Sequence, residues 1–387
     1  MNIGASHFNG ERLKEAREAR CLTITALAES LDISRQSITA YEKGTQSPRL
    51  DILDKIADRL NVPSRFFLRP NIDTINKNIV FYRSLASTTN LERSRSEKRL
   101  MWLKEMVQYL EGFIKFLDVN FPNINLSDEE ISNLRDEEIE NIANKCREFW
   151  NIGLGAISNI ARLLENNGAI ISRGEIETDA VDAFSEWSQN DRPYLILGND
   201  KKCGVRSRFD LAHELGHLVL HKNLSKLNKN NLKIIEHQAN YFAGAFLMPA
   251  VTFISDFLYP SLDTFVALKQ KWRTSIQAMI VRTSNLGLIT KKTEERLWIN
   301  LARRGWRKKE PLDDVIPHEQ PMFLRRSIDL LISNNIQTKA DLKINLPYAQ
   351  KDIEVLLNLD IDQLNKESIE PNHLKPGVKI FNIHSRN

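Results

Sequence analysis

The segment Phe209-Asp210-Leu211-Ala212-His213-Glu214-Leu215-Gly216-His217-Leu218 contains an H-E-x-x-H motif within an amphipathic helical pattern. Because residues four apart lie on one face of a helix, His213 and His217 can bind the same metal ion. Glu214 would then lie beside the open position of that metal, where a base can take a proton from water. By chance the motif arises in roughly one in a hundred chains with this histidine content, so a second element is needed.

The segment Glu236-His237-Gln238-Ala239-Asn240-Tyr241-Phe242-Ala243 supplies that element, because catalytic zinc sites normally use three protein ligands. This segment also has a helical pattern, and two antiparallel helices joined by the intervening loop can bring Glu236 to the metal. Asn240, one turn later, is placed to orient a ligand imidazole. The small residues Ala239 and Ala243 allow the two helices to approach closely.

Other residues near these two segments have more than one interpretation. His221 is interpreted as a structural residue or as a support for a metal ligand, and His237 as pointing away from the metal. Tyr194 and Tyr241 are candidates for stabilising an oxyanion, although packing is the favoured interpretation of both. Cys203 is expected to be a free thiol at the surface. The Asn- and Lys-rich loop over 222–233 is interpreted as solvated, with gating of the site as the alternative.

Strand patterns appear only near the middle of the chain. Gly168 is expected to end a helix in the left-handed conformation, and short strands are predicted over 169–173 and 194–197. The strand over 194–197 is a candidate edge strand, along which a substrate chain could pair main chain to main chain. Helical patterns span 91–118, 127–150, 156–167, 206–221, 232–247 and 262–289. The predicted fold class is therefore mainly α (α+β), with one small β-sheet at the centre and a helical C-terminal region.

Residues 10–44 have the pattern of a helix-turn-helix bundle. The positions expected to face its core are Leu13, Ala16, Leu27, Ala28, Leu31, Ile38 and Tyr41. Ser34 is expected to cap the third helix, over 35–43, and Gly44 to end it. A recognition helix presents polar or basic side chains to base edges near its N-terminus. The candidate DNA-binding residues are Arg35, Gln36, Ser37, Thr39 and Lys43.

Composition narrows the function classes further. The chain has 387 residues, and 54 Lys and Arg against 50 Asp and Glu leave a net charge of only +4. This small charge excludes a protein that binds nucleic acid through a uniformly basic surface. The cysteines Cys21, Cys146 and Cys203 are too far apart for a zinc knuckle or a disulfide framework. The first twenty residues lack an apolar core, and no apolar run is long enough to span a membrane. The expected location is the cytoplasm.

The N-terminal segment resembles the Xre/Cro family of phage-repressor-like domains. The resemblance is carried by Leu27-Ala28, Ser37-Ile38, Tyr41-Glu42-Lys43-Gly44 and Pro48. It implies binding to double-stranded DNA, usually as a homodimer on two half-sites. The chain departs from the family at Ile24, where a phosphate-binding Gln is common. A module for protein docking or dimerisation is therefore the alternative interpretation.

The central segment resembles the ImmA/IrrE family of HExxH metallopeptidases. Besides the two metal segments, the resemblance is carried by Val181-Asp182-Ala183-Phe184-Ser185, Arg192-Pro193, Phe246-Leu247-Met248-Pro249, Leu268-Lys269-Gln270-Lys271-Trp272 with Ser275, Gly305-Trp306 and Glu310-Pro311. It implies zinc as the cofactor, His213, His217 and Glu236 as its ligands, and Glu214 as the catalytic base. It also implies a protein substrate, typically another helix-turn-helix repressor that is cleaved in a stress, phage or mobile-element response.

Together these features predict five regions along the chain. Residues 1–70 are expected to form an Xre-type DNA-binding domain, 71–165 a helical connector, 166–258 the zinc metallopeptidase core, 259–316 a helical scaffold, and 317–387 a helical region of unknown role. The predicted function is a DNA-binding transcriptional regulator with zinc endopeptidase activity, directed at a repressor or at itself. The alternative is a repressor or antitoxin whose metal centre is structural, sensory or inactive.

Overall fold

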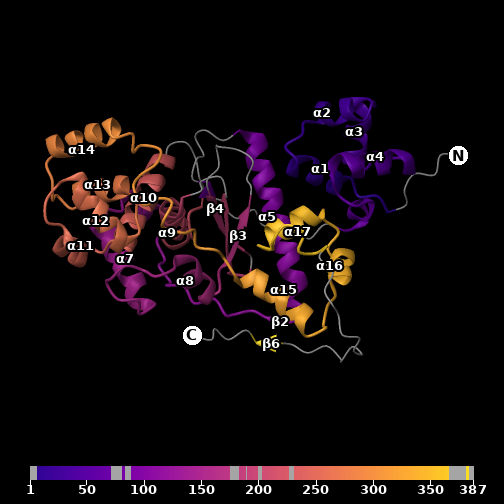
Figure 1. Ribbon diagram of the computed structural model, residues 1–387. Coiled ribbons are helices and arrows are strands. Elements are labelled where there is room, and N and C mark those ends of the chain that lie inside the picture. Colours follow the sequence, from indigo (N-terminus) through magenta and orange to yellow (C-terminus); the bar gives the residue numbers. More distant parts are fainter. Residues whose placement is uncertain are drawn as a thin grey trace.

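The computed structural model describes residues 7–70, 81–82, 89–174, 183–188, 190–198, 203–225, 231–365 and 381–382. Within these residues the fold is mainly helical with a small central sheet, which confirms the predicted fold class (Figure 1). The helix-turn-helix bundle lies at one end, beside the C-terminal helices, and α11–α14 lie at the other end. None of the described helices combines the length and the apolar character needed to cross a bilayer.

The helices have these bounds: α1 Gly10–Ala19, α2 Ile24–Ser30, α3 Arg35–Glu42, α4 Leu50–Leu60, the 3-10 helix η1 Ser64–Leu68, α5 Asn90–Glu111, α6 Asp128–Asn133, α7 Asp136–Phe149, α8 Ile160–Asn166, α9 Gly204–Leu220, α10 Leu232–Leu247, α11 Ala250–Asp256, α12 Leu262–Trp272, α13 Ile276–Asn285, α14 Lys291–Arg303, α15 Phe323–Ser333, α16 Lys339–Asn345 and α17 Gln350–Leu356. The strands are β1 Phe81–Tyr82, β2 Ile114–Lys115, β3 Ile170–Gly174, β4 Ala183–Trp187, β5 Pro193–Gly198 and β6 Phe381–Asn382.

The helices α1–α4 form the predicted helix-turn-helix bundle. Ser34 caps α3, because its Oγ accepts a hydrogen bond from the backbone N–H of Ser37 at 3.0 Å. The residues expected in the core are buried, namely Leu13, Ala16, Leu27, Ala28, Leu31 and Ile38, whereas Tyr41 is only partly buried. At the start of α1, a Cβ on Gly10 would lie 2.1 Å from the carbonyl oxygen of Tyr41, so only glycine allows α1 to approach α3 this closely.

The central sheet has the strand order β1-β4-β5-β3, in which β3 is parallel to β5 and β4 is antiparallel to it. The predicted strands over 169–173 and 194–197 are confirmed by β3 and β5. The strand β4 was not predicted, because Ser185 and Glu186 interrupt its apolar pattern. The hypothesis that 194–197 is an edge strand is wrong, because β5 pairs with a strand on each side.

The two faces of the sheet belong to two different cores. Ile170, Tyr194 and Ile196 pack into a core shared with the helix-turn-helix bundle, α5 and α15–α17. Alternate residues, such as Leu195 and Leu197, pack into a second core with α7–α10, α12 and α13. This alternation follows from the two-residue period of a strand. The sheet therefore separates the end of the chain with the helix-turn-helix bundle from the end with α9 and α10.

Two predicted helices are shorter or divided. The helix expected over 91–118 ends at Glu111, and residues 114–115 form a short strand with β6. The helix expected over 127–150 is divided into α6 and α7. It is divided because the Glu138 carboxylate accepts the backbone N–H of Arg135 at 2.9 Å, which caps a new helix start.

A buried polar network joins the helix-turn-helix bundle to the rest of the protein. The Arg12 guanidinium of α1 donates to Glu15 at 2.9 Å and to Glu105 of α5 at 2.7 Å. Trp102 of α5 donates to Glu15 at 2.6 Å, and the Tyr348 hydroxyl donates to Glu105. Burial raises the pKa of Glu15, although the Arg12 charge opposes that shift. Three segments far apart in sequence, α1, α5 and the turn at Tyr348, therefore form hydrogen bonds with one another's buried polar groups.

We expect Glu105→Ala to lower the free energy of unfolding by about 3 kcal/mol, because it leaves the buried Arg12 charge without one of its two carboxylate partners. Arg12 is 2% exposed and Glu105 is 9% exposed, so the ion pair is shielded from bulk solvent. Urea denaturation of the full chain measures the effect. Glu29→Ala on the exposed face of α2 is the matched control. Equal unfolding midpoints for the two variants would contradict the structural role of the network.

Candidate metal centre

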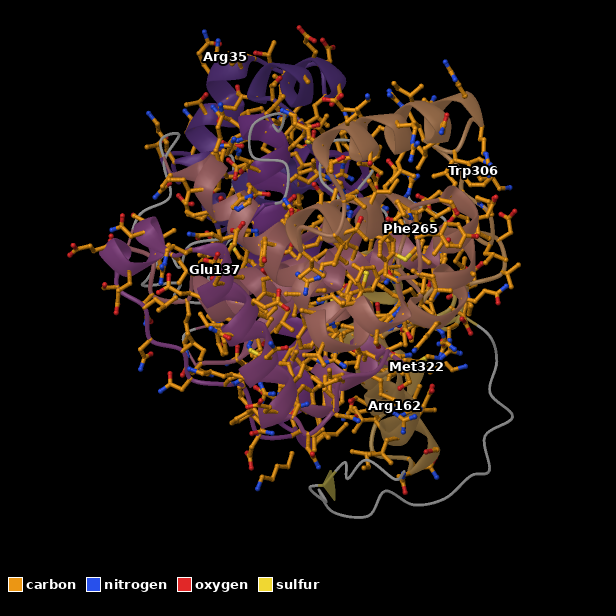
Figure 2. The ribbon with its side chains drawn as sticks, turned by 90° about the vertical axis from the view of Figure 1, so that its left-hand side faces the viewer. Arg35, Glu137, Arg162, Phe265, Trp306 and Met322 are labelled. Atoms are coloured by element: carbon orange, nitrogen blue, oxygen red, sulfur yellow. The ribbon has the colours of Figure 1, made fainter. Side chains whose placement is uncertain are left out.

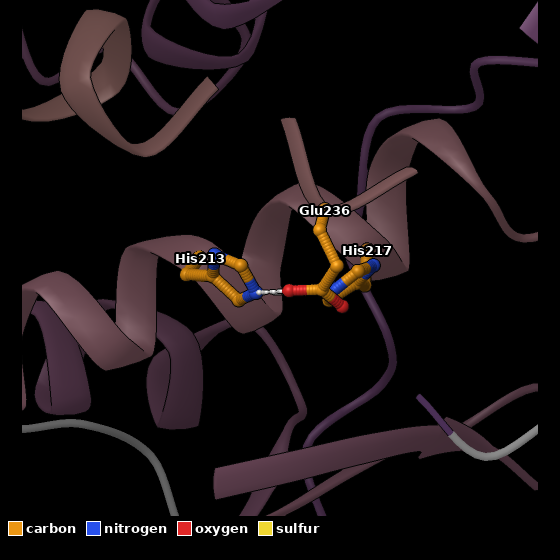
Figure 3. A group of neighbouring side chains, drawn as sticks. All are labelled: His213, His217 and Glu236. Atoms are coloured by element: carbon orange, nitrogen blue, oxygen red, sulfur yellow. Dashed lines mark hydrogen bonds and ion pairs between the residues drawn. The ribbon is translucent and has the colours of Figure 1, made fainter. Parts of the chain in front are cut away.

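The helices α9 and α10 pack directly against each other, as the two metal-binding segments predict. A Cβ on Gly216 would lie 3.2 Å from both the Cα and the carbonyl oxygen of Ala239, so small residues set the distance between the helices. At this separation the side chains of α9 and α10 meet on one side of the contact. His213 and His217 extend from α9, and Glu236 extends toward them from α10 (Figure 3).

The three predicted ligands form one compact group. The Nε2 atoms of His213 and His217 lie 3.0 Å apart. The Glu236 carboxylate oxygens lie 3.5 Å from Nε2 of His213 and 3.6 Å from Nε2 of His217. Both imidazoles are fully buried, whereas the Glu236 side chain is 22% exposed. The group could hold a metal ion that remains within reach of solvent and substrate.

Hydrogen bonds fix the proton of His213 on the nitrogen that faces away from this group. The side-chain amide of Asn240 donates through Nδ2 to the backbone carbonyl of Glu236 at 2.8 Å, so its Oδ1 is the acceptor. The Nδ1 of His213 lies 3.1 Å from that Oδ1 and must donate to it. The Nε2 of His213 therefore carries a lone pair. Asn240 thus contacts His213 from α10, on the side of the ring away from Glu236.

A longer relay fixes the proton of His217 in the same way. Gln238 donates through Nε2 to the carbonyl of Ile131 at 2.6 Å, so its Oε1 accepts from Nε2 of His221 at 2.9 Å. The Nδ1 of His221 is then an acceptor, and Nδ1 of His217 donates to it at 3.0 Å. Burial, together with the nearby His217, lowers the pKa of His221 to about 3, which keeps this ring neutral. The Nε2 of His217 also carries a lone pair.

The arrangement fits a divalent cation. Two lone pairs that face each other at 3.0 Å repel unless a positive charge lies between them and the carboxylate. In a tetrahedral site with metal–nitrogen bonds of about 2.0–2.1 Å, ligand atoms lie about 3.3 Å apart, close to the observed separations of 3.0, 3.5 and 3.6 Å. The Glu236 carboxylate lies beside both lone pairs and supplies the negatively charged oxygen ligand that a divalent cation favours.

Glu214 follows His213 on α9 and is completely buried. The hydroxyl of Ser185 in β4 donates to Oε2 of Glu214 at 2.6 Å. Ser185 lies on the sheet face that also presents Ala183 to the core around α9. Ser185 is not recognisable as a site residue from the sequence, because its contact with Glu214, 29 positions away, depends on the sheet. The sequence feature that points to Ser185 is its place in Val181–Ser185, one of the stretches that carry the family resemblance. Val181 and Asp182 lie outside the described residues.

The remaining candidates lie away from the group. Tyr194 is on the sheet face opposite α9, and its ring lies 5.7 Å from the Lys104 ammonium. The Tyr241 ring lies 6.0 Å from the Arg282 guanidinium. His237 binds Asp136 at 2.8 Å, as expected for a residue outside the ligand set. Of the loop over 222–233, residues 226–230 lie outside the described part.

The expectation that Cys203 is a surface thiol is wrong. Cys203 is 8% exposed, although it is a free cysteine. It precedes α9 at a point where the chain packs closely against the segment after residue 315. A Cβ on Gly204 would lie 2.4 Å from the carbonyl oxygen of Ile316, so this junction has no room for solvent.

The candidate DNA-binding residues lie on the accessible side of α3. Arg35, Gln36 and Lys43 are exposed, and Ser37 and Thr39 are partly exposed. Figure 2 shows Arg35 at the periphery of the molecule. The Ser37 hydroxyl lies 2.8 Å from that of Ser34, and the Thr39 hydroxyl donates to the carbonyl of Arg35 at 3.0 Å. Arg35, Gln36 and Lys43 are therefore the candidate side chains that are exposed on α3 and its C-terminal cap.

We expect Gln238→Leu to weaken zinc binding by about 10-fold to 100-fold, because it removes the acceptor that fixes the His221 proton. The measurement is competition with a zinc-sensitive dye, and circular dichroism checks that helix content is unchanged. His237→Leu is the control, since its exposed imidazole lies on the same helix outside the relay. Equal zinc affinity in the two variants would contradict the relay.

Comparison with known families agrees with this geometry. Residues 166–284 match the model of the IrrE N-terminal-like domain, and residues 13–67 match a helix-turn-helix model. The first match contains all three residues of the metal group, and the second contains α3. The comparison with curated proteins gives no match. The chain thus carries an IrrE N-terminal-like peptidase domain together with a helix-turn-helix domain.

Proposed function

We propose that this protein is a DNA-binding transcriptional regulator with zinc-dependent endopeptidase activity. The observation that carries the proposal is the cluster of His213, His217 and Glu236, with two imidazole lone pairs directed at one point. Glu214 lies on the same helix, held by Ser185. This combination of three ligands and an adjacent carboxylate is the donor set of zinc hydrolases. The IrrE N-terminal-like match supports the same reaction class.

Zinc in this site would lower the pKa of a water molecule to about 7 and polarise the carbonyl of a peptide bond. Glu214 takes a proton from the attacking water and later delivers it to the amine nitrogen that leaves when the C–N bond breaks. The Ser185 hydroxyl holds one oxygen of Glu214, which limits rotation of the carboxylate. Asn240 and His221 keep the two ligand imidazoles in the tautomer that leaves Nε2 unprotonated.

We expect Glu214→Gln to reduce peptide cleavage by about 100-fold to 10,000-fold, because an amide cannot accept the proton. Zinc content should stay at the wild-type level, since Glu214 is not one of the three clustered ligands. The substrate to test is the helix-turn-helix repressor encoded nearest to this gene, incubated with purified protein and zinc. Mass spectrometry identifies the fragments, including any that come from the protein itself.

The exposed Glu295→Gln in α14 is the control for this experiment. Cleavage that persists in Glu214→Gln would contradict the mechanism. Zinc binding without cleavage by the wild type would favour the alternative, a repressor or antitoxin with a structural or sensory metal. Fragments of the protein alone would identify self-cleavage as the reaction.

The DNA-binding part of the proposal rests on α3. Its N-terminal turn presents Arg35 and Gln36 to solvent, which suits contacts to guanine and adenine edges, and Lys43 suits contact with a phosphate. Binding as a homodimer to two half-sites is the arrangement that we propose for this domain. Ile24 replaces a common phosphate-binding Gln, so the remaining contacts carry more of the affinity.

We expect Arg35→Ala to weaken DNA binding by about 10-fold to 100-fold and to relax the preference at one base pair, because it removes a bidentate contact. The probe is the duplex that the wild-type protein selects from random sequence, and fluorescence anisotropy measures affinity. Arg296→Ala, an exposed arginine of α14, controls for the lost charge. If both variants bound like the wild type, α3 would not be the recognition helix.

A further inference from the structure

A groove of about 390 Å³ lies next to the metal centre. Its floor is formed by α9 and α10, and its opposite wall by α13, Trp298 of α14 and Arg307. Asn240, which orients His213, lines the end of the groove nearest the metal. From Asn240 the lining continues toward the N-terminus of α9, as far as Arg206. Along α10 it continues toward the C-terminus, as far as Gly244. The groove therefore follows the two antiparallel metal-binding helices away from the ligands.

The spacing of these residues sets the length of the groove. Arg206 lies seven residues before His213, which is about 10 Å along a helix, and Gly244 lies eight residues after Glu236, which is about 12 Å. An extended chain advances about 3.3 Å per residue. The far end of the groove is therefore about three residues from a peptide bond positioned at the metal.

The far end carries more positive than negative charge, because Arg206 and Arg307 line it and Asp210 lines the groove one helical turn nearer the metal. The Arg206 guanidinium donates to the backbone carbonyls of Arg307 and Lys308 at 3.2 and 2.7 Å. These bonds place two guanidinium-bearing residues together, and within the described residues neither Arg206 nor Arg307 forms an ion pair with a carboxylate. Arg282, in contrast, is matched by Glu140 at 2.6 and 2.7 Å. An acidic side chain is the natural partner for Arg206 and Arg307.

The middle of the groove is open and partly apolar. Val281 is 43% exposed and Trp298 is partly exposed, although both belong to packed helices. Gly244 contributes no side chain to the floor, and a Cβ there would meet only the Cδ of Arg282, at 3.7 Å. Because packing does not require glycine at this position, the space above it is free for a ligand.

We propose that this groove binds the substrate polypeptide on one side of the scissile bond and selects an acidic side chain about three residues from that bond. Apolar side chains of the same segment contact Val281 and Trp298, and the carboxylate binds Arg206 and Arg307. This inference rests on the proposed function, and it adds the class of sequence that the enzyme recognises.

The test measures binding separately from cleavage. The protein is the full-length, zinc-loaded Glu214→Gln variant, which holds a peptide without cutting it. The probes are two fluorescein-labelled decapeptides of alternating leucine and serine that differ at one internal residue, glutamate in one and lysine in the other. We expect the glutamate peptide to bind about tenfold more tightly by fluorescence anisotropy.

Adding Arg307→Glu should reverse this preference, whereas adding Arg303→Glu should leave it intact. Arg303 is also exposed and changes the net charge equally, but it does not line the groove. Adding Gly244→Leu should weaken binding of both peptides, because its side chain fills the floor. Equal affinity for the two peptides, no binding of either, or equal effects of Arg307→Glu and Arg303→Glu would overturn the inference.

A second arm reports on cleavage by the wild-type protein with zinc, using a mixture of proteome-derived peptides read by mass spectrometry. Enrichment of Asp or Glu about three residues from the cut bond supports the groove, and its loss in Arg307→Glu supports it further. Selective binding without any cleavage would refute the hydrolase proposal and leave the groove assignment standing. Cleavage without acidic preference would refute the groove assignment and leave the hydrolase proposal standing.

Discussion

The metal centre depends on the lone pairs of two fully buried imidazoles, held 3.0 Å apart. Each lone pair exists because the opposite ring nitrogen carries the proton. Two side-chain amides, each anchored to a backbone carbonyl, determine this proton position. The carbonyls belong to Ile131 of α6 and to Glu236 itself. The site is therefore pre-organised by the backbone, and a bound cation would relieve the repulsion between the lone pairs.

Helix packing and proton placement depend on each other in this site. The relay from Gln238 through His221 to His217 works only at hydrogen-bond distance, and the contact of Gly216 with Ala239 sets that distance. A larger residue at either position would separate α9 from α10 and lengthen the bond between His221 and Gln238, which joins the two helices. The small residues between the helices thus affect the protonation of the metal ligands as well as the packing.

Much of the site could be predicted from sequence because its residues lie on two helices, where a fixed period places them on one face. His213, His217, Glu236 and Asn240 follow from that period once α9 and α10 are assumed to touch. Ser185 could not be found in this way, because its contact with Glu214 needs the position of β4 in the sheet. The burial of Cys203 and the central place of β5 were missed for the same reason, since both depend on contacts between segments distant in sequence.

The region after residue 316 carries no chemical signature in its sequence, yet it completes the structure around the DNA-binding bundle. The Tyr348 hydroxyl satisfies Glu105, and Asp352 of α17 pairs with Arg20 beside α1. Lys104 of α5 in turn forms an ion pair with Glu186 of β4 at 3.0 Å. The residue before Glu186 in that strand, Ser185, donates a hydrogen bond to Glu214. Opposite faces of one strand thus contact the two ends of the molecule. Residues without any catalytic chemistry thereby fix the position of the helix-turn-helix bundle relative to the metal centre.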